Sequence, residues 1–318
     1  MGTVKSYLSL IKFSHTIFAM PFALIGFFLA TKPLWSIYIS RWKNNYETYG
    51  FVRPEYAKTF YNNYPLDLIQ LVVRFLLVIG CMILARSAAM AFNRYLDRSF
   101  DAKNPRTAIR EIPAGLIKAN SALLFTIVCS LLFIVCSFLI NQLCFYLSPV
   151  ALLVVLGYSY TKRFTPLCHL ILGLGLSLAP IGAYLAVTGQ FDLLPVLFSF
   201  TVLFWVSGFD IIYALQDEEF DKANKLYSIP AWLGKAKALR VSEVFHVLSA
   251  VCVLLAGWLG DFSWLYWIGA AIFIGMLIYQ HSIVKPNDLR KVNIAFMTTN
   301  GIASVVFAIF VIADLFVN

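Results

Sequence analysis

Three oxygen-bearing side chains stand four residues apart in the segment NRYLDRSFD, and they belong to Asn93, Asp97 and Asp101. On a helix this spacing places all three on one face, each about 6 Å above the last. The apolar segment LLVIGCMILARSAAMAF runs just upstream. The row is therefore predicted to lie where a hydrophobic helix leaves a membrane. Carboxylate and amide oxygens are the ligands that hard divalent cations prefer.

A second acidic row lies far downstream, in the segment DIIYALQDEEFD. Asp217 and Asp221 are again four residues apart, and Asp210 lies two turns before Asp217 on about the same face. The apolar segment LLPVLFSFTVLFWVSGF precedes this row as well. One such row is usually a solvated helix face. Two rows at the ends of two hydrophobic helices instead favour a shared site, in which carboxylates hold divalent cations that bind phosphate oxygens.

The composition is that of a polytopic membrane protein. Of the 318 residues, 60% are hydrophobic and 13% are charged, about half the charged fraction of a typical soluble domain. The mean hydropathy is +0.79. The net charge of +9 fits nucleic-acid binding or basic cytoplasmic loops, and in a membrane protein the loops are favoured. The six cysteines show no CxxC spacing, so we expect neither a disulfide framework nor a zinc site.

Nine apolar stretches approach the length of a membrane-spanning helix, which predicts an all-α bundle in the bilayer. Several stretches are short or closely joined, so eight spans remain an alternative. The first stretch lacks a small-residue cleavage site and is predicted to be a retained helix. The predicted helices cover residues 14–31, 68–92, 119–141, 143–160, 166–188, 193–215, 241–259, 262–280 and 293–316.

The distribution of lysine and arginine predicts the orientation. If the N-terminus is cytoplasmic, 18 of the 25 basic residues lie in loops on the inner side and five on the outer side, and Arg74 and Arg86 lie within a helix. Basic loops face the cytoplasm. We therefore expect the C-terminus outside and both acidic rows at the cytoplasmic face of a bacterial inner membrane.

The connection between the first two spans, roughly residues 32–67, is rich in tryptophan, tyrosine and phenylalanine. Such residues prefer the membrane interface. We predict one or two helices lying on the membrane surface as an anchor, with lipid access as an alternative role. The whole chain, residues 1–318, is predicted to form a single transmembrane domain.

Two inner loops carry basic residues that could bind phosphate, one just after the first acidic row and one after the fourth predicted helix. Arg106 and Arg110 lie in DAKNPRTAIREIPAGLIKAN, and Lys162 and Arg163 lie in YSYTKRFTP. A guanidinium group binds phosphate through a bidentate fork. The alternative for each residue is ordinary positive-inside charge.

Arg86 lies seven residues before Asn93, on the same helical face and about two turns deeper in the membrane. A charge at that depth is costly and usually faces a cavity or a partner. Arg86 is expected to contact a diphosphate or a substrate carboxylate, and structural pairing with an aspartate is the alternative. Asp210 is likewise predicted to lie inside its helix.

The remaining histidines and glycines show no motif of a cofactor site. His15 stands at a helix entrance and is interpreted as structural, and His169, His246 and His281 are too scattered to form a metal-ligand pattern. The run LILGLGLSLAPIG follows no strand, so it is not a dinucleotide loop. Its small residues are expected to let helices pack closely in lipid.

Together these motifs resemble those of the UbiA superfamily of intramembrane prenyltransferases. The first row matches the pattern NxxxDxxxD, and DIIYALQDEEFD matches DxxxD with its upstream aspartate and YA pair. The arginine before the first motif, the run RTAIR and the basic loop YSYTKR are present too. The resemblance covers nearly the whole chain and implies a fold of nine helices.

The resemblance implies an aromatic polyprenyltransferase that uses Mg²⁺, held by both acidic motifs, to grip the diphosphate of a polyprenyl donor. The stretches FSHTIFAMPFAL and NPRTAIREIPAG are similar to those of 4-hydroxybenzoate polyprenyltransferases, and more similar still to relatives assigned to menaquinone synthesis by the futalosine route. The implied partners are a polyprenyl diphosphate, a small aromatic acid and membrane lipid, with no nucleic acid. The long aromatic connection departs from the compact pattern of the family.

The expected reaction is attack of an electron-rich ring on an allylic cation left by the departing diphosphate, followed by loss of a proton. Arg86 is expected to hold the acceptor carboxylate, and Asp210 to support the acidic motifs. The expected metal ligands are Asn93, Asp97, Asp101, Asp217 and Asp221. The expected phosphate-binding residues are Lys162, Arg163 and Arg106 or Arg110. The aromatic residues expected to shelter the cation are Tyr158, Tyr160 and Tyr213.

Two alternatives remain at this point. A cation-coupled transporter would also place acids and arginine in the membrane, but these acids cluster at loops and no inverted repeat of broken helices is evident. A prenyltransferase of another acceptor class (homogentisate, haem, chlorophyllide or archaeal lipid) would share the same motifs.

Overall fold

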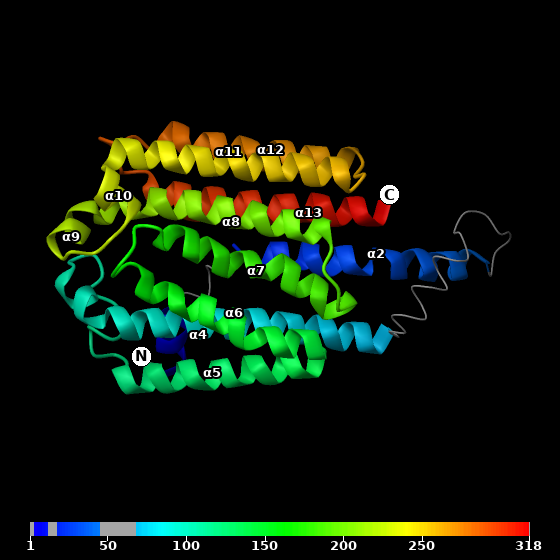
Figure 1. Cartoon of the computed structure of the whole chain (residues 1–318), viewed down its shortest axis with the longest axis horizontal. Coiled ribbons are helices and arrows are strands. Elements are labelled where there is room, and N and C mark those ends of the chain that lie inside the picture. The colour runs from blue at the N-terminus through cyan, green and yellow to red at the C-terminus, as the bar shows by residue number, and fades with distance from the viewer. Residues whose placement is uncertain (1–2, 12–17, 45–67, 318) are drawn as a thin grey trace.

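The computed structural model describes residues 3–11, 18–44 and 68–317, and in these residues the regular structure is entirely helical (Figure 1). The first half contains α1 Thr3–Leu10, α2 Met20–Asn44, α4 Leu68–Lys103, α5 Ala119–Ile140, α6 Gln142–Thr161 and α7 Cys168–Thr188. The second half contains α8 Leu193–Ala214, the 3₁₀ turn η2 Leu215–Asp217, α9 Glu218–Ala223, α10 Ile229–Leu233, α11 Lys235–Leu259, α12 Trp264–Ile283, the π-helix η3 Ile294–Thr299 and α13 Asn300–Val317.

Eight segments of the described chain are long and apolar enough to span a bilayer, and Met20–Lys32 is a shorter apolar segment. This confirms the prediction of an all-α membrane bundle with about nine spans. Residues 14–17 of the first predicted span lie outside the described part, and so do residues 45–67 of the aromatic connection. Within that connection, α2 continues as helix to Asn44, and the predicted surface helices stay a prediction.

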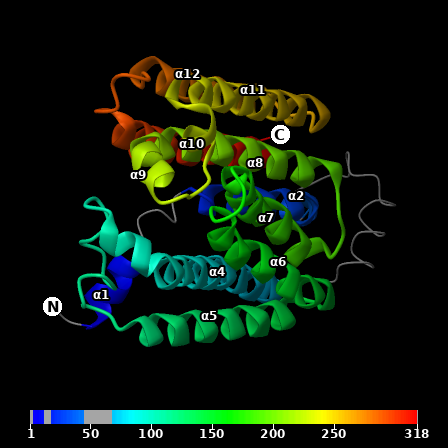
Figure 2. The ribbon, with the colours of Figure 1, turned by 60° about the vertical axis from the view of Figure 1, so that its left-hand side comes forward.

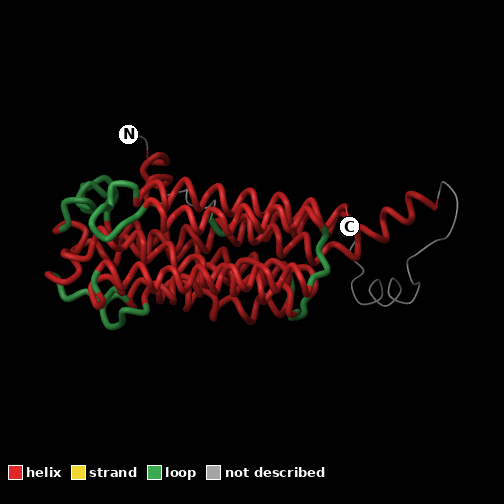
Figure 3. The backbone as a smooth tube through the Cα atoms, turned by 90° about the horizontal axis from the view of Figure 1, so that it is seen from above, coloured by secondary structure: helices red, strands yellow, loops and turns green. Residues whose placement is uncertain are grey.

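The long helices run side by side along one axis, with α7 and α8 in the middle of the bundle (Figures 1 and 2). α7 packs against α8, α2 and α6, while α4 pairs with α5, α8 pairs with α11, and α12 pairs with α13. Most of the loop backbone lies at the end that carries the N-terminus (Figure 3). The loops after α4, α6, α8 and α12 all lie there, so the basic residues assigned to inner loops gather at one end of the bundle.

Glycine and large aromatic side chains bring the helices into contact. Apolar side chains gain little from leaving lipid, so close van der Waals contact has to supply the packing energy. A Cβ on Gly173 of α7 would lie 2.4 Å from the Leu203 carbonyl oxygen of α8, and a Cβ on Gly208 of α8 would lie 2.3 Å from the His246 ring of α11. Gly173 therefore packs helices as expected. Gly182, in contrast, has open space at its Cβ position.

Asp314, near the end of α13, caps the start of α12. Its fully buried carboxylate accepts hydrogen bonds from the backbone N–H of Ser263 at 2.9 Å, from the Ser263 hydroxyl at 2.6 Å and from the backbone N–H of Tyr266 at 3.1 Å. The first backbone N–H groups of a helix have no partner within the helix. A residue 48 to 51 positions away in the sequence thus fixes the entry of α12.

We expect Asp314→Ala to destabilise the protein by about 2 kcal/mol or more, because buried donors would lose a charged acceptor. Thermal unfolding of the purified protein in detergent measures the change. Asp314→Asn keeps an acceptor oxygen and is expected to cost less. Asp192 caps α8 from an exposed position, so Asp192→Ala should lower the midpoint of thermal unfolding less than Asp314→Ala does. An equal loss in the two variants would contradict the role of Asp314 as a buried cap of α12.

Candidate functional site

The first acidic row lies on one face of a single long helix, as its spacing predicts. α4 extends for 36 residues, beyond the length needed to span a bilayer, and carries Asn93, Asp97 and Asp101 in its last three turns. The Asn93 side chain donates a hydrogen bond to Asp97 Oδ2 at 3.0 Å. Asp101 is almost completely buried. The row therefore projects from a rigid element.

The second row is not on one continuous helix. α8 ends at Ala214, the 3₁₀ turn η2 holds Asp217, and α9 begins at Glu218 and holds Asp221. Asp210 stays inside α8. The interruption separates Asp210 from the two later carboxylates, which a simple four-residue spacing did not anticipate. Asp221 is completely buried.

Each of the four carboxylates in the DxxxD pairs faces one basic side chain. All four basic residues come from the two loops that were predicted to hold phosphate. The pairs are Asp97–Arg163 at 3.5 Å, Asp101–Arg110 at 2.6 Å, Asp217–Arg106 at 2.5 Å and Asp221–Lys162 at 2.7 Å. The structure therefore brings the predicted acids and the predicted cations together at one end of the bundle.

Arg106 connects the loop after α4 to the second row. Its Nε and Nη2 donate to the two oxygens of Asp217 at 3.1 Å and 2.5 Å, and its Nη1 donates to the Tyr213 hydroxyl at 2.9 Å. Burial alone would lower the pKa of Arg106, but the Asp217 carboxylate and Tyr213 outweigh it, so the pKa is raised. Arg106 is a permanent positive charge at this position.

Lys162 forms the corresponding ion pair with Asp221 of the second row. Its Nζ lies 2.7 Å from Asp221 Oδ1, and the Ser228 hydroxyl donates to Asp221 Oδ2 at 2.8 Å. Burial lowers the pKa of Lys162, but Asp221 and Asp217 raise it further, so the net shift is upward. Lys162 also acts electrostatically on Asp97 of the first row. The ammonium group therefore lies between the two rows and stays protonated at neutral pH.

The donor set fits a hard divalent cation in its chemistry, because its members offer carboxylate and amide oxygens only. Asp101 Oδ2 is buried and has no hydrogen-bond partner among the described residues, so this carboxylate oxygen could accept a cation. Across residues 3–11, 18–44 and 68–317, however, no three His, Cys, Asp or Glu side chains lie close enough to hold one ion together. The four basic side chains neutralise the carboxylates in this arrangement.

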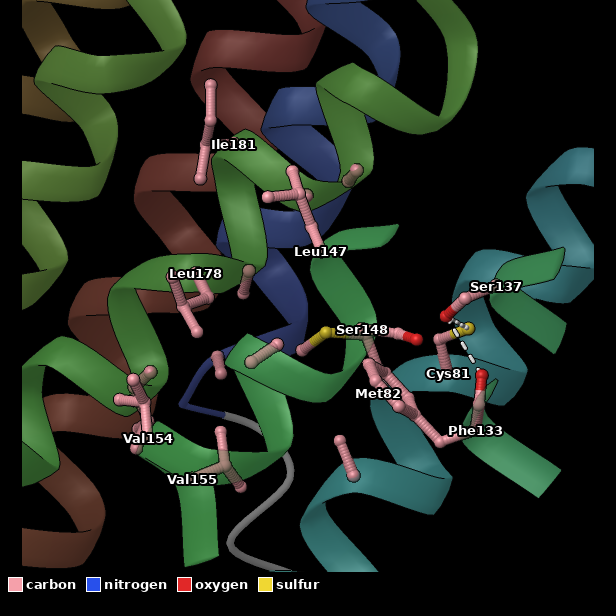
Figure 4. A pocket seen from close by; sticks show the side chains of 18 of the residues that line it. Cys81, Met82, Phe133, Ser137, Leu147, Ser148, Val154, Val155, Leu178 and Ile181 are labelled. Carbon is pink, nitrogen blue, oxygen red and sulfur yellow. Dashed lines mark hydrogen bonds between the residues drawn. The ribbon is translucent and has the colours of Figure 1, made fainter. Parts of the chain in front are cut away.

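A cavity of about 370 Å³ opens between α4, α5, α6 and α7 (Figure 4). Its walls are mostly aliphatic, and its few polar wall groups include Ser137 and Cys81, whose Oγ and Sγ lie 3.9 Å apart. Gly182 lines it too, which explains the open space at that glycine. The cavity reaches from Tyr158 in the last turn of α6, toward the end of the bundle that holds the acidic rows, to Phe191 beyond the C-terminal end of α7.

Arg86 and Tyr158 mark the inner end of this cavity, toward the acidic rows. Arg86 lines the cavity, and its Nε is buried without a hydrogen-bond partner in the described part of the chain. The Tyr158 phenol lies within electrostatic reach of Arg86, Asp97 and Asp210. Tyr158 therefore stands where the apolar cavity meets the charged residues.

The other two predicted aromatic residues lie elsewhere. Tyr160 is 44% exposed and does not line the cavity. The Arg163 guanidinium carbon lies 5.4 Å from the centroid of the Tyr160 ring. Tyr160 cannot face the cavity together with Tyr158, because residues two apart on a helix point in nearly opposite directions. Tyr213 stacks on Phe296 of the π-helix with 4.2 Å between ring centroids, and its hydroxyl accepts from Arg106.

Two residues of the site escaped the sequence reasoning. His169 Nδ1 lies 2.6 Å from Asp210 Oδ2, although the scattered histidines suggested no site. Arg94 is buried beside the first row and was assigned to ordinary loop charge. A signal existed for Arg94, since it directly follows Asn93 in the row that its spacing placed on a helix. No local signal pairs a residue of α7 with one of α8.

The Arg106–Asp217 pair allows a direct test of the tie between the loop and the second row. Arg106→Ala and Asp217→Ala are each expected to lower thermal stability, and the double variant should lose about 1 kcal/mol less than the sum of the two, because both single variants break the same contact. Arg290–Asp288 is a surface pair whose side chains are 88% and 38% exposed, and the same cycle there is expected to show a smaller coupling. Additive losses at Arg106 and Asp217 would contradict the tie.

Residues 64–302 match the UbiA prenyltransferase family. The 4-hydroxybenzoate octaprenyltransferase of Tolumonas auensis is 31% identical over 223 residues, which cover 70% of this chain and 78% of that protein. A UbiA homologue from Aeropyrum pernix has a TM-score of 0.71 at 25% identity, covering 95% of this chain and 97% of that one. A UbiA homologue from Archaeoglobus fulgidus, bound to DMAPP and Mg²⁺, shares the fold with a TM-score of 0.70 at 19% identity, covering 98% and 100%. The chain therefore belongs to the UbiA prenyltransferase family and is an integral membrane prenyltransferase.

Proposed function

We propose that this protein transfers a polyprenyl group from a polyprenyl diphosphate to a small aromatic acid in quinone biosynthesis. The observation that carries the proposal is the polarity of the site. An apolar cavity ends, at Arg86 and Tyr158, beside two acidic rows and four basic side chains. A substrate with a long apolar tail and a charged diphosphate head has the same polarity.

The cavity suits the tail of the donor. α6 lines it from Cys144 to Tyr158, which is about 21 Å along a helix axis. Its aliphatic wall would keep the apolar surface of the donor's tail out of contact with water. The octaprenyl group in the name of the Tolumonas auensis relative supports a long prenyl chain as donor.

The acidic rows and the basic loops suit the diphosphate head. Magnesium, when bound, supplies the charge neutralisation that a departing diphosphate needs. The residues that would hold it are Asn93, Asp97, Asp101, Asp217 and Asp221. The guanidinium and ammonium groups that now face these carboxylates would bind the remaining phosphate oxygens, and they are Arg106, Arg110, Lys162 and Arg163.

Tyr158 and Arg86 then serve the reacting groups. As the bond between the allylic carbon and the diphosphate oxygen breaks, the face of the Tyr158 ring stabilises the developing carbocation. The unpaired Arg86 Nε lies at the end of the cavity and suits the carboxylate of the acceptor. A ring carbon of the acceptor attacks the cation from this position, and the ring then loses the proton of that carbon and regains its aromaticity. Asp210 supports the site from α8.

We infer 4-hydroxybenzoate as the first acceptor to test, because it is the one named for the relative from Tolumonas auensis. A dihydroxynaphthoate is the related alternative, since it offers the same carboxylate and electron-rich ring. We further infer one functional domain in a bacterial inner membrane with the site facing the cytoplasm. The gathering of the basic loops at the end that holds both acidic rows supports this orientation.

Membranes that contain the protein are expected to form prenylated product from a labelled polyprenyl diphosphate, Mg²⁺ and one of the two acceptors. EDTA should abolish the product, and added Mg²⁺ should restore it. Asp97→Asn and Asp217→Asn are each expected to lower turnover at least about a hundredfold, because each removes charge from the diphosphate site. Asp288→Asn, a change of the same kind at an exposed loop, is the control. Full activity of either site variant would refute the assignment.

The assignment of the cavity to the prenyl tail of the donor is tested by a substitution that fills the cavity. Gly182→Leu is expected to raise KM about tenfold for octaprenyl diphosphate and to change KM little for dimethylallyl diphosphate, because only the long tail reaches Gly182. Gly275 of α12 also has open space at its Cβ position but lies outside the cavity, so Gly275→Leu serves as the matched control. An equal effect of Gly182→Leu on both donors would place the tail elsewhere.

A further inference from the structure

Two buried charged side chains beside the first acidic row take no part in the steps above. Arg94, in α4, is 4% exposed, and Glu111, in the loop after α4, is 6% exposed. None of the ion pairs of the described chain includes either residue. A buried charge without a counter-charge is costly, so each of the two needs an opposite charge nearby.

Glu111 is fixed between α1 and the turns of its own loop. Its Oε1 accepts a hydrogen bond from the Ser9 hydroxyl of α1 at 2.5 Å. Its backbone carbonyl accepts from the N–H groups of Leu116 and Ile117 at 2.9 Å and 3.0 Å. Leu10 of α1 lies in the same buried cluster as Ile117. The Glu111 carboxylate is therefore held at one place beside the end of α4.

Arg94 stands between two carboxylates. It is within electrostatic reach of Asp101 and of Glu111. Asp101 lies seven residues further along α4, on the same helical face as Arg94. Three atoms of this group are buried and have no hydrogen-bond partner in the described chain, and they are Arg94 Nε, Asp101 Oδ2 and Glu111 Oε2. Both carboxylates thus attract the guanidinium group of Arg94.

The charges of this group balance in pairs. Arg110 faces Asp101 at 2.6 Å, which leaves Glu111 to offset the charge of Arg94. Without the charge of Glu111, Asp101 would have to offset two guanidinium groups. A carboxylate beside an excess of positive charge binds a divalent cation more weakly, because the positive groups repel the cation.

We propose that Glu111 and Arg94 are positioning residues for the metal ion, in which Glu111 offsets the charge of Arg94 and so keeps Asp101 Oδ2 available to a divalent cation. The inference rests on the proposed function, in which Asp101 is one of the residues that hold Mg²⁺. Both residues act through Asp101, and α1 takes part by fixing the Glu111 carboxylate through Ser9.

The test uses Mn²⁺ as a probe of the Mg²⁺ site, because both cations favour carboxylate oxygens. Binding of Mn²⁺ to the purified protein in detergent, without substrates, is measured from the loss of the electron paramagnetic resonance signal of unbound Mn²⁺. Glu111→Gln keeps an acceptor for the Ser9 hydroxyl and removes only the charge. It is expected to weaken Mn²⁺ binding about tenfold. The Mg²⁺ concentration for half-maximal prenyl transfer should rise by a similar factor, while kcat at saturating Mg²⁺ changes little.

A double variant separates the charge of Glu111 from its contribution to structure. Arg94→Met removes the positive charge, so the combination of Glu111→Gln with Arg94→Met should bind Mn²⁺ nearly as tightly as the unchanged protein. A double variant that binds as weakly as Glu111→Gln would overturn the proposal. If the double variant does not fold, Glu111→Asp still decides. It keeps the charge and should bind Mn²⁺ more tightly than Glu111→Gln, and equal weakening in the two would also overturn the proposal.

Ser9→Ala is the complementary variant, because it removes the hydrogen bond to Glu111 and keeps the charge. It should lower thermal stability and leave Mn²⁺ binding almost unchanged. A loss of Mn²⁺ binding as large as that of Glu111→Gln would contradict the role assigned to the charge. Glu243→Gln, the same change at an exposed position of α11, is the matched control and should behave like the unchanged protein.

The outcomes separate this inference from the proposed function. If the unchanged protein forms no product with either acceptor, the proposed function is overturned, and weaker Mn²⁺ binding by Glu111→Gln would still support the inference. If the unchanged protein forms product, but Mn²⁺ binding is equal in it and in Glu111→Gln, or absent from both, only this inference is overturned. Absence of both product and Mn²⁺ binding would overturn both.

Discussion

The pairing of carboxylates with basic side chains at one end of the bundle is the constraint on which the site depends. An isolated charge in a region of low dielectric constant is costly, and this end of the bundle buries Asp101 and Asp221 almost completely. Each therefore needs a cation or a set of hydrogen bonds. The loops after α4 and α6 supply the cations, and so these basic loops also hold the acidic rows in place.

The ion pairs also determine how segments far apart in the sequence meet. Arg106 reaches Asp217 across 111 residues, and the backbone N–H of Tyr227 donates to the Lys162 carbonyl at 2.7 Å. These contacts join the first half of the bundle to the second at the inner end. The long helices pack closely because glycines permit contact, as where Gly173 of α7 meets Leu203 of α8.

Much of this arrangement follows from the sequence, because helix periodicity is a local property. The row Asn93, Asp97 and Asp101 and the cavity-facing Arg86 were both predicted from spacing along one helix. The 3₁₀ turn that holds Asp217 was not predicted, since no proline or glycine marks the end of α8. The contact of His169 with Asp210 depends on how α7 packs against α8, and one sequence does not contain that information. The family match removes the transporter alternative, which composition alone left open.

The π-helix η3 shows how a buried polar group shapes the site from a distance. Asn300 accepts from the Trp205 indole N–H at 2.9 Å and from the Gln280 amide at 2.8 Å, and it donates to the carbonyls of Ala295 and Phe296. A π-turn leaves backbone groups without their usual helical partners, and Asn300 satisfies two of them.

This local geometry has a consequence at the active end. Phe296, held by η3, stacks on Tyr213 at 4.2 Å, and the Tyr213 hydroxyl receives the hydrogen bond from Arg106. An α-helical turn in place of η3 would change the direction in which the Phe296 side chain points, because each residue advances by a different angle. The position of the Arg106 guanidinium, and with it the tie between the loop after α4 and the second acidic row, therefore depends on a polar cluster in the core of the second half of the bundle.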